Sequence, residues 1–161
     1  MIYNLTYLKD RVGQNYLGLE IPTDIVDPYL TKLKDILGEE NYNIFTQNQQ
    51  TRDSSHYHIT VINVMEYNRL SKEIGIDKFI NSLEPILHYE IDDLEMKGVG
   101  LATKEPNSAY FIVCESDKLD AIRTRFDSEA LEKLPKQDFH VTLGFNPKDV
   151  FGVAKNKVIE E

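Results

Sequence analysis

Two five-residue stretches of this chain repeat one order of residue types. Residues 57–61 read Tyr-His-Ile-Thr-Val, and residues 139–143 read Phe-His-Val-Thr-Leu. Because alternate side chains of a β-strand point to the same face, the histidine and the threonine of each stretch would share one face. One such pair arises often by chance, but two copies with matching flanks among only four histidines are a stronger signal. The pattern predicts two strands that each contribute half of one site.

The side chains of these two halves, His58 with Thr60 and His140 with Thr142, have the chemistry to cleave a phosphodiester. Imidazole has an ordinary pKa of about 6.5, so one histidine of a pair can be neutral while the other is protonated at neutral pH. The neutral one would remove a proton from an attacking water or ribose 2′-hydroxyl, and the protonated one would donate a proton to the leaving oxygen. The threonine hydroxyls would donate hydrogen bonds to the non-bridging phosphate oxygens. We therefore predict these four residues as the catalytic group.

Two other functions would use some of the same residues. His56 and His58 are two positions apart, as two metal ligands on one strand can be. A metal site needs a third and usually a fourth ligand, however, and it would leave the repeated threonines unexplained. A module that binds a nucleotide without cleaving it would gain nothing from two histidines suited to opposite proton transfers. The sequence therefore favours an enzyme without a metal ion or another cofactor, with His56 in the loop before the strand and His88 at the surface.

Four residues outside the motifs are candidates for binding the substrate. Tyr110 and Phe145 could each offer an aromatic ring on which a nucleobase stacks. Arg52 precedes the first motif and Lys148 follows the second, so that either could attract a phosphate group.

Other residues near the motifs have a structural interpretation. Tyr57 and Phe139 alternate with the histidines, and we expect both rings in the core. Cys114 is the one cysteine of the chain and lies in an apolar stretch, which is typical of a buried structural thiol. Lys155 and Lys157 are typical of scattered charges on the solvated surface.

The size and composition of the chain limit the classes of partner. A length of 161 residues suits one domain, and 41% hydrophobic with 28% charged residues is the composition of a globular protein. There is no apolar run that could span a bilayer and no leader-like N-terminus, so we expect a cytoplasmic protein with no membrane partner. A net charge of −9 opposes binding along a long nucleic-acid duplex. The composition favours a nucleotide, a cyclic oligonucleotide or an RNA terminus, and it leaves the oligomeric state open.

Hydrophobic spacing and turn residues predict the order of the elements along the chain. They are a strand at 16–21, a helix capped by Thr23 or Asp24 and ending before Gly38, a loop at 46–55, a strand at 57–64, a helix at 76–87 that Pro85 ends or kinks, strand material at 89–103, a turn at 106–108, a strand at 109–114, a helix capped by Ser116 with Leu119, Ile122 and Phe126 on one face, and a break at Leu134 and Pro135 before the second motif strand.

Two segments of this list have the same internal order, which indicates a duplication. Residues 16–64 and 109–145 both run from a strand through a helix and a loop to a motif strand. We predict one α+β domain in which two strand-helix-strand lobes are related by a pseudo-twofold axis, with mostly antiparallel sheets lining a central cleft and helices outside. The expected boundaries are 1–161 for the domain, about 16–88 for the first lobe, about 89–146 for the second lobe and 147–161 for a C-terminal tail.

The motifs resemble those of the 2H phosphoesterase superfamily, which carries a pair of His-x-Thr or His-x-Ser motifs in a duplicated α+β domain. Residues 57–63 and 140–145 are most similar to its Swiss-army-knife branch, which is linked to RNA repair. The resemblance implies hydrolysis of 2′,3′-cyclic phosphates, 2′-5′ linkages or RNA ends, or, as in a phage-encoded branch, of cyclic oligonucleotide signals. It also implies His140 as the base and His58 as the acid, roles that would exchange for substrates cleaved in the reverse sense.

Overall fold

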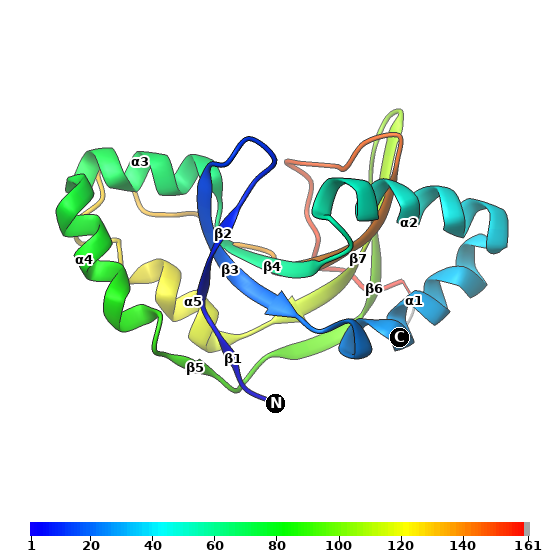
Figure 1. The fold of residues 1–161 in the computed structure, drawn as a ribbon, viewed down its shortest axis with the longest axis horizontal. Helices are drawn as coiled ribbons and strands as arrows, with labels where there is room; N and C mark the ends of the chain where they lie inside the picture. The colour runs from blue at the N-terminus through cyan, green and yellow to red at the C-terminus, as the bar shows by residue number, and fades with distance from the viewer. Residues whose placement is uncertain (160–161) are drawn as a thin grey trace. The chain divides into compact units, whose positions relative to one another are not determined.

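The computed structural model describes residues 1–159, and these residues form five helices and eight strands (Figure 1). In chain order the elements are β1 (Tyr3–Asn4), β2 (Thr6–Lys9), β3 (Asn15–Ile21), α1 (Thr23–Leu37), α2 (Glu39–Asp53), β4 (Tyr57–Ile62), α3 (Val64–Ile74), α4 (Ile76–Ile86), β5 (Glu90–Ile91), β6 (Glu95–Lys104), β7 (Asn107–Glu115), α5 (Asp117–Thr124) and β8 (His140–Asn146). The fold is of the α+β class, as the sequence predicts.

The strand order has the symmetry that the duplication predicts. The larger sheet is open and has the order β2-β3-β4-β8-β7-β6, while β1 and β5 form a separate antiparallel pair. The two motif strands, β4 and β8, are therefore neighbours at the centre of the larger sheet. Outward from them come β3 and β2 on one side, and β7 and β6 on the other. The pairs β2–β3, β4–β8, β7–β8 and β6–β7 are all antiparallel.

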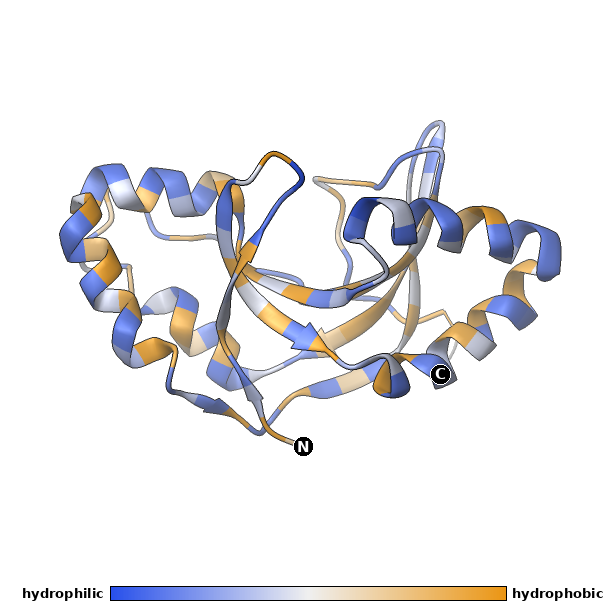
Figure 2. Cartoon of the chain, viewed as in Figure 1, coloured by the Kyte–Doolittle hydropathy of each residue, from blue (hydrophilic) through white to orange (hydrophobic). Residues whose placement is uncertain are grey.

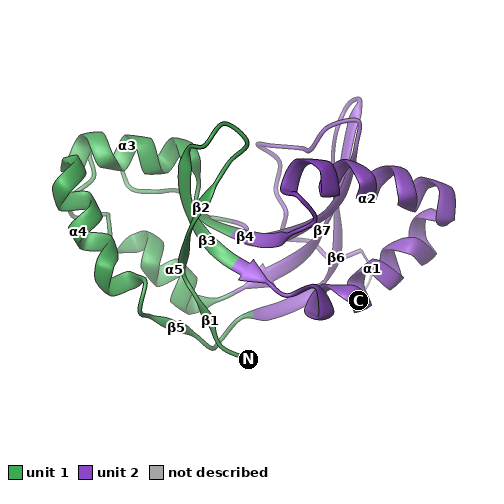
Figure 3. Cartoon of the chain, in the orientation of Figure 1, with its two compact units in different colours: residues 1–19, 60–94, 116–137 green, residues 20–59, 95–115, 138–161 purple. Residues whose placement is uncertain are grey.

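Within this fold the chain divides into two compact units, coloured separately in Figure 3. Unit 1 comprises residues 1–19, 60–94 and 116–137, and its core includes side chains of α3, α4 and α5 such as Leu70, Phe79 and Ile122. Unit 2 comprises residues 20–59, 95–115 and the chain from Asp138 onward, and it contains α1, α2, β6, β7 and β8. The units interleave along the sequence, and strands β3 and β4 each have residues in both.

The most instructive difference from the predicted elements is α2, because the sequence predicts a loop at residues 46–55. That expectation is wrong: Glu39–Asp53 is a helix, although Figure 2 shows it as largely hydrophilic. Within unit 2 the helix is held by polar side chains instead of an apolar stripe. The Asn48 side chain donates to the Phe145 carbonyl at 2.8 Å, and the Gln49 side chain donates to the His56 carbonyl at 2.9 Å. Hydrophobic periodicity cannot reveal a helix that packs in this way.

Three element boundaries also differ from the prediction. The first motif strand ends at Ile62 instead of residue 64, because a reciprocal capping box between Asn63 and Glu66 begins α3, a helix that the sequence did not predict. Helix α1 begins at Thr23 without a side-chain cap, so neither Thr23 nor Asp24 has the predicted capping role. The stretch 89–103 divides between the short β5 and the long β6. The predicted cap at Ser116 is confirmed, since its side chain accepts from the Leu119 amide.

Candidate active site

Strands β4 and β8 bring the histidines of both motifs onto one face of adjacent strands. The strands pair antiparallel with Ile59 opposite Val141, and both of these side chains are fully buried. In this register His58 lies opposite Thr142, and each histidine is one position from the buried pair, so both imidazoles point to the other face. Both histidines are partly exposed, as a site that meets solvent requires.

The threonines of the motifs differ in exposure. Thr142 is buried at 8% exposure, whereas Thr60 is partly exposed. Thr60 lies two positions beyond His58 on β4, so its side chain points to the same face of that strand. The aromatic residues that precede the histidines, Tyr57 and Phe139, are both buried, which confirms their predicted place in the core.

The ring of His140 is held by contacts at both nitrogens. Its Nδ1 lies 2.7 Å from the carbonyl oxygen of Asp138, which can only accept a hydrogen bond, so Nδ1 donates. Its Nε2 is then the acceptor nitrogen and lies 3.5 Å from the Nζ atom of Lys155. The edge-to-face packing of the Phe111 ring, at a centroid distance of 5.7 Å, fixes the ring from the side. The contacts select the tautomer that a general base acting through Nε2 needs.

Electrostatics keep His140 neutral at pH 7. Burial is the largest effect and lowers the pKa of His140 to about 4, and the positive charge of Lys155 acts in the same direction. The backbone carbonyl of Asp138 and the carboxylate of Asp149 oppose this change. His58 also lowers the pKa of His140, so the His58 imidazole is close enough to act electrostatically on His140.

His58 has a more balanced environment. Burial lowers its pKa below the ordinary value, while the carboxylates of Asp53, Asp149 and Glu20 raise it and Arg52 lowers it. The direction of the change leaves His58 mostly neutral at pH 7 in the absence of a bound anion. The carboxylates around His58 nevertheless favour its protonated form, which suits the role of the proton donor.

The contacts of Arg52 and Phe145 differ from those that substrate-binding residues would need. The Arg52 guanidinium binds the Asp53 carboxylate through Nε and Nη2, both at 2.8 Å, and also forms an ion pair with Asp149. It lies 4.9 Å over the Phe145 ring, and Phe145 is buried in the core of unit 2. The positive charge of Arg52 is therefore already paired, and the ring of Phe145 is covered.

The other two substrate-binding candidates are more accessible. Tyr110 is partly exposed, and its ring meets that of Phe45 edge to face at 5.5 Å. Lys148 is exposed, and its backbone amide donates to the side chain of Asn107 at 3.2 Å. These positions leave both side chains able to meet a ligand.

Lys155 is the residue of this site that sequence reasoning missed. The expectation of a solvated charge is wrong, because Lys155 is buried with 5% exposure, whereas Lys157 is exposed as expected. The Lys155 amide donates to the Asp138 side chain at 3.0 Å, and the amide of Ile159 donates to the Val99 carbonyl at 2.7 Å. These hydrogen bonds fix the C-terminal segment. The sequence around Lys155 contains no local pattern that predicts them.

Two glycines allow the close packing that positions these side chains. A Cβ atom on Gly100 would lie 2.5 Å from the Phe111 ring and 2.7 Å from the Lys157 carbonyl oxygen, so only glycine lets both approach β6. A Cβ atom on Gly144 would lie 2.8 Å from the backbone of Phe45, so that glycine lets α2 lie directly on β8. The packing around the site thus depends on close approach to the backbone at Gly100 and Gly144.

The remaining candidate groups have structural or surface positions. Cys114 is buried, and burial raises the pKa of its thiol to about 12, which fits a structural residue. His56 is exposed in the loop before β4, and His88 is exposed beside Glu84. Within residues 1–159 no group of three or more His, Cys, Asp or Glu side chains is placed to hold a metal ion.

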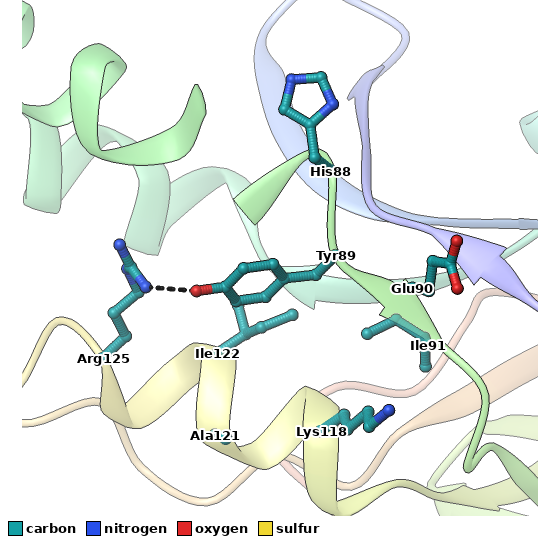
Figure 4. Close-up of a pocket in the computed structure, with 8 residues that line it drawn as sticks. All are labelled: His88, Tyr89, Glu90, Ile91, Lys118, Ala121, Ile122 and Arg125. Carbon is teal, nitrogen blue, oxygen red and sulfur yellow. Dashed lines mark hydrogen bonds between the residues drawn. The ribbon is translucent and has the colours of Figure 1, made fainter. Parts of the chain in front are cut away.

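A pocket occurs in unit 1, but the motifs do not contribute to it (Figure 4). Its lining residues come from α5 and from the chain around β5, and the Arg125 side chain donates to the Tyr89 hydroxyl at 2.9 Å. They are His88, Tyr89, Glu90, Ile91, Lys118, Ala121, Ile122 and Arg125. This pocket is therefore separate from the candidate active site.

Comparison with known proteins identifies the family. The sequence model of the Swiss Army Knife 2H phosphoesterase domain matches residues 22–151. The match covers most of the chain and includes both motif strands, so the chain belongs to the 2H phosphoesterase family, in agreement with the motif resemblance. The general class of reaction is therefore that of a phosphoesterase. No curated protein and no solved structure matches the chain. Over the described residues, every helix is too short or too polar to cross a membrane.

Proposed function

We propose that this chain hydrolyses a nucleotide or RNA-end phosphodiester, either a 2′,3′-cyclic phosphate or a 2′-5′ linkage, by general acid–base catalysis without a metal ion. The observation that carries the proposal is the pairing of β4 with β8, which places both motif histidines on one face of adjacent strands. The family match supports the reaction class, and the net charge of −9 supports a small or terminal substrate over a long duplex.

In the proposed reaction His140 is the general base and His58 is the general acid. The neutral Nε2 of His140 takes a proton from the attacking water while the water oxygen forms its bond to phosphorus. The bond from phosphorus to the leaving ribose oxygen then breaks, and protonated His58 donates its proton to that oxygen. Because burial lowers the pKa of His58, its protonated form needs the negative charge of the bound phosphate. The assignment of the base follows the family resemblance and is supported by the neutral state of His140 at pH 7 and by the hydrogen bond that fixes its tautomer.

The threonines act on the developing negative charge. The hydroxyls of Thr142 and Thr60 donate hydrogen bonds to non-bridging phosphate oxygens, whose charge rises in the transition state. Such neutral donors contribute most where water is excluded, and the 8% exposure of Thr142 provides that condition on β8.

The experiment that tests this proposal is a substrate panel in the presence of EDTA. The protein is incubated with 2′,3′-cyclic nucleotides, 2′-5′ dinucleotides, and cyclic di- and trinucleotides, and the products are separated by chromatography. We expect product from a cyclic nucleotide or a 2′-5′ dinucleotide, loss of that product in His140→Ala, and an unchanged rate in His88→Ala, whose histidine is exposed beside Glu84.

Other results would redirect or overturn the proposal. Cleavage of cyclic oligonucleotides alone would assign the chain to the degradation of cyclic signals. Activity that EDTA abolishes would show metal-dependent chemistry. Saturable nucleotide binding with no product from any substrate would show a binding module.

A further inference from the structure

Lys155 is a buried cation whose contacts with other groups are long. Its side chain is 6% exposed, and its Nζ atom lies 3.5 Å from Asp149 Oδ1 and 3.5 Å from His140 Nε2. The rings of Phe111 and Phe151 are each centred 5.7 Å from the same atom. Removing an ammonium group from water is costly unless close acceptors replace the lost water. The contacts around Lys155 only partly meet that need.

The Asp149 carboxylate, which lies beside the Lys155 ammonium group, is shared with another cation. Asp149 also forms a close ion pair with Arg52, and Arg52 in turn binds Asp53. An ammonium group has three donor hydrogens and can accept none, so Lys155 retains the capacity for a strong, charge-assisted hydrogen bond. The ligand that fits this position is an anion with oxygen acceptors.

Resting on the proposed function, we propose that Lys155 binds a non-bridging oxygen of the substrate's phosphate group beside His140. Any hydroxyl or water that gives its proton to His140 Nε2 must approach within about 3 Å of that nitrogen. The attacked phosphorus and its oxygens then lie next to the Lys155 ammonium group, which is 3.5 Å from Nε2. The C-terminal segment thus adds a positively charged group to the histidines and threonines of the two motifs.

The same contact couples substrate binding to the base. The charged and titratable groups that influence His140 are Lys155, Asp149 and His58, and Arg52 acts on Asp149. The positive charge of Lys155 lowers the pKa of His140. A phosphate group bound to Lys155 offsets that positive charge, so the pKa of His140 rises and Nε2 becomes a stronger proton acceptor. The base would therefore be strengthened by the anion on which it acts.

The test follows the pKa of the His140 ring by NMR titration, with and without inorganic phosphate at matched ionic strength in chloride. In the wild-type protein we expect phosphate to raise this pKa. In Lys155→Met we expect a higher pKa without phosphate and no further response to phosphate. Lys155→Arg keeps the charge and should keep part of the response, and Lys157→Met is the matched control because Lys157 is an exposed lysine of the same segment.

Kinetics on the substrate found by the panel give a second measurement. Loss of a charge-assisted hydrogen bond predicts a kcat/KM in Lys155→Met that is lower by roughly 10–100-fold, partial recovery in Lys155→Arg, and no change in Lys157→Met. Lys155→Gln serves in place of the methionine variant if the latter does not fold.

The wild-type titration alone can overturn the inference. A His140 pKa that phosphate leaves unchanged in the wild-type protein would contradict it, and so would an equal phosphate response in Lys155→Met. The outcome is separable from that of the proposed function: a Lys155-dependent response in a protein that cleaves no phosphodiester would support the anion site and reject the enzyme.

Discussion

Two buried cations, Arg123 in unit 1 and Lys155 in unit 2, show how differently a fold can hold a charge. Arg123 is 3% exposed, and its guanidinium meets the Glu66 carboxylate at 2.8 Å through both terminal nitrogens. The same nitrogens donate to the carbonyls of Val61 at 2.7 Å and Pro135 at 2.6 Å. These short bonds join α5 to the start of α3, to the end of β4 and to the loop that precedes β8, so Arg123 has a structural role.

The contacts of Lys155 are fewer and longer. Its Nζ atom lies 3.5 Å from the Asp149 carboxylate and 3.5 Å from Nε2 of His140. A buried charged side chain with a structural role is expected to have close partners, because burying a charge without a partner is costly. Lys155 has only long contacts beside a histidine. Its ammonium group can therefore still donate a hydrogen bond to a ligand. The length of the contacts, more than burial itself, distinguishes the two cations.

The largest effect on stability is expected from removing the guanidinium of Arg123. Arg123→Met leaves the Glu66 carboxylate and two carbonyls without their partner, so we expect the free energy of unfolding to fall by about 3–5 kcal/mol. Lys155→Met places an apolar side chain in the buried position and leaves Asp149 paired with Arg52, so it should lower the free energy of unfolding by less than about 1 kcal/mol. Urea unfolding of both variants at pH 7 measures the difference, and equal losses would show that the comparison is mistaken.

A second effect on stability comes from the titration of His140. Its pKa is about 4 in the folded protein and about 6.5 when unfolded, so the unfolded state binds more protons between these values. Stability contributed by neutral His140 is therefore complete above pH 6.5 and is lost as the pH falls toward 4, by about 3 kcal/mol.

The control for this prediction is His140→Asn. Asparagine can still donate to the Asp138 carbonyl but does not titrate. Denaturant unfolding at pH 7 and pH 4 should show the wild-type protein losing about 3 kcal/mol more than the variant. An identical loss in both proteins would contradict the neutral state of His140 in the folded protein.

The pH dependence of activity sharpens the division of roles between the histidines. Because burial lowers the pKa of His58, the free enzyme loses its protonated acid at a pH below 6.5. We expect kcat/KM to fall by roughly tenfold for each pH unit above the pKa of His58. A kcat/KM that stays constant from pH 6 to pH 8.5 would contradict the assignment of His58 as the acid.

A further prediction on stability tests the packing that holds β8 in place. Gly144→Ala would bring a Cβ atom within 2.8 Å of the Phe45 backbone, so α2 must shift. We expect a loss of about 1–3 kcal/mol in the free energy of unfolding, measured with urea. Stability equal to that of the wild-type protein would show that α2 is free to move on β8.

The motif strands could be predicted from the sequence because their side-chain pattern is local. Alternation of aromatic, histidine, aliphatic and threonine residues is enough to locate β4 and β8, and the side chain of Ser116 is enough to locate the start of α5. The burial of Cys114 also follows from its apolar neighbours. Each of these features depends on residues within a few positions of one another.

The features that could not be predicted depend on contacts between distant segments. Helix α2 is fixed by Asn48, whose partner carbonyl is 97 positions away, and the helix has no apolar stripe to identify it. Lys155 reaches the site because hydrogen bonds to Asp138 and Val99 fix the C-terminal segment. A lysine in a polar stretch has the same local appearance whether it is solvated or buried. The sequence therefore predicts the histidines of the site but not the cation beside them.

The central claim is that His58 and His140 act together in one proton-transfer reaction, and the kinetics of single and double variants test it most directly. We predict that His58→Ala and His140→Ala each lower kcat/KM by roughly 10²–10⁴-fold, and that the double variant is little worse than the weaker single variant, because residues that act as a unit are not additive. Near wild-type kcat/KM in either single variant, on every phosphodiester that the wild-type protein cleaves, would contradict the account.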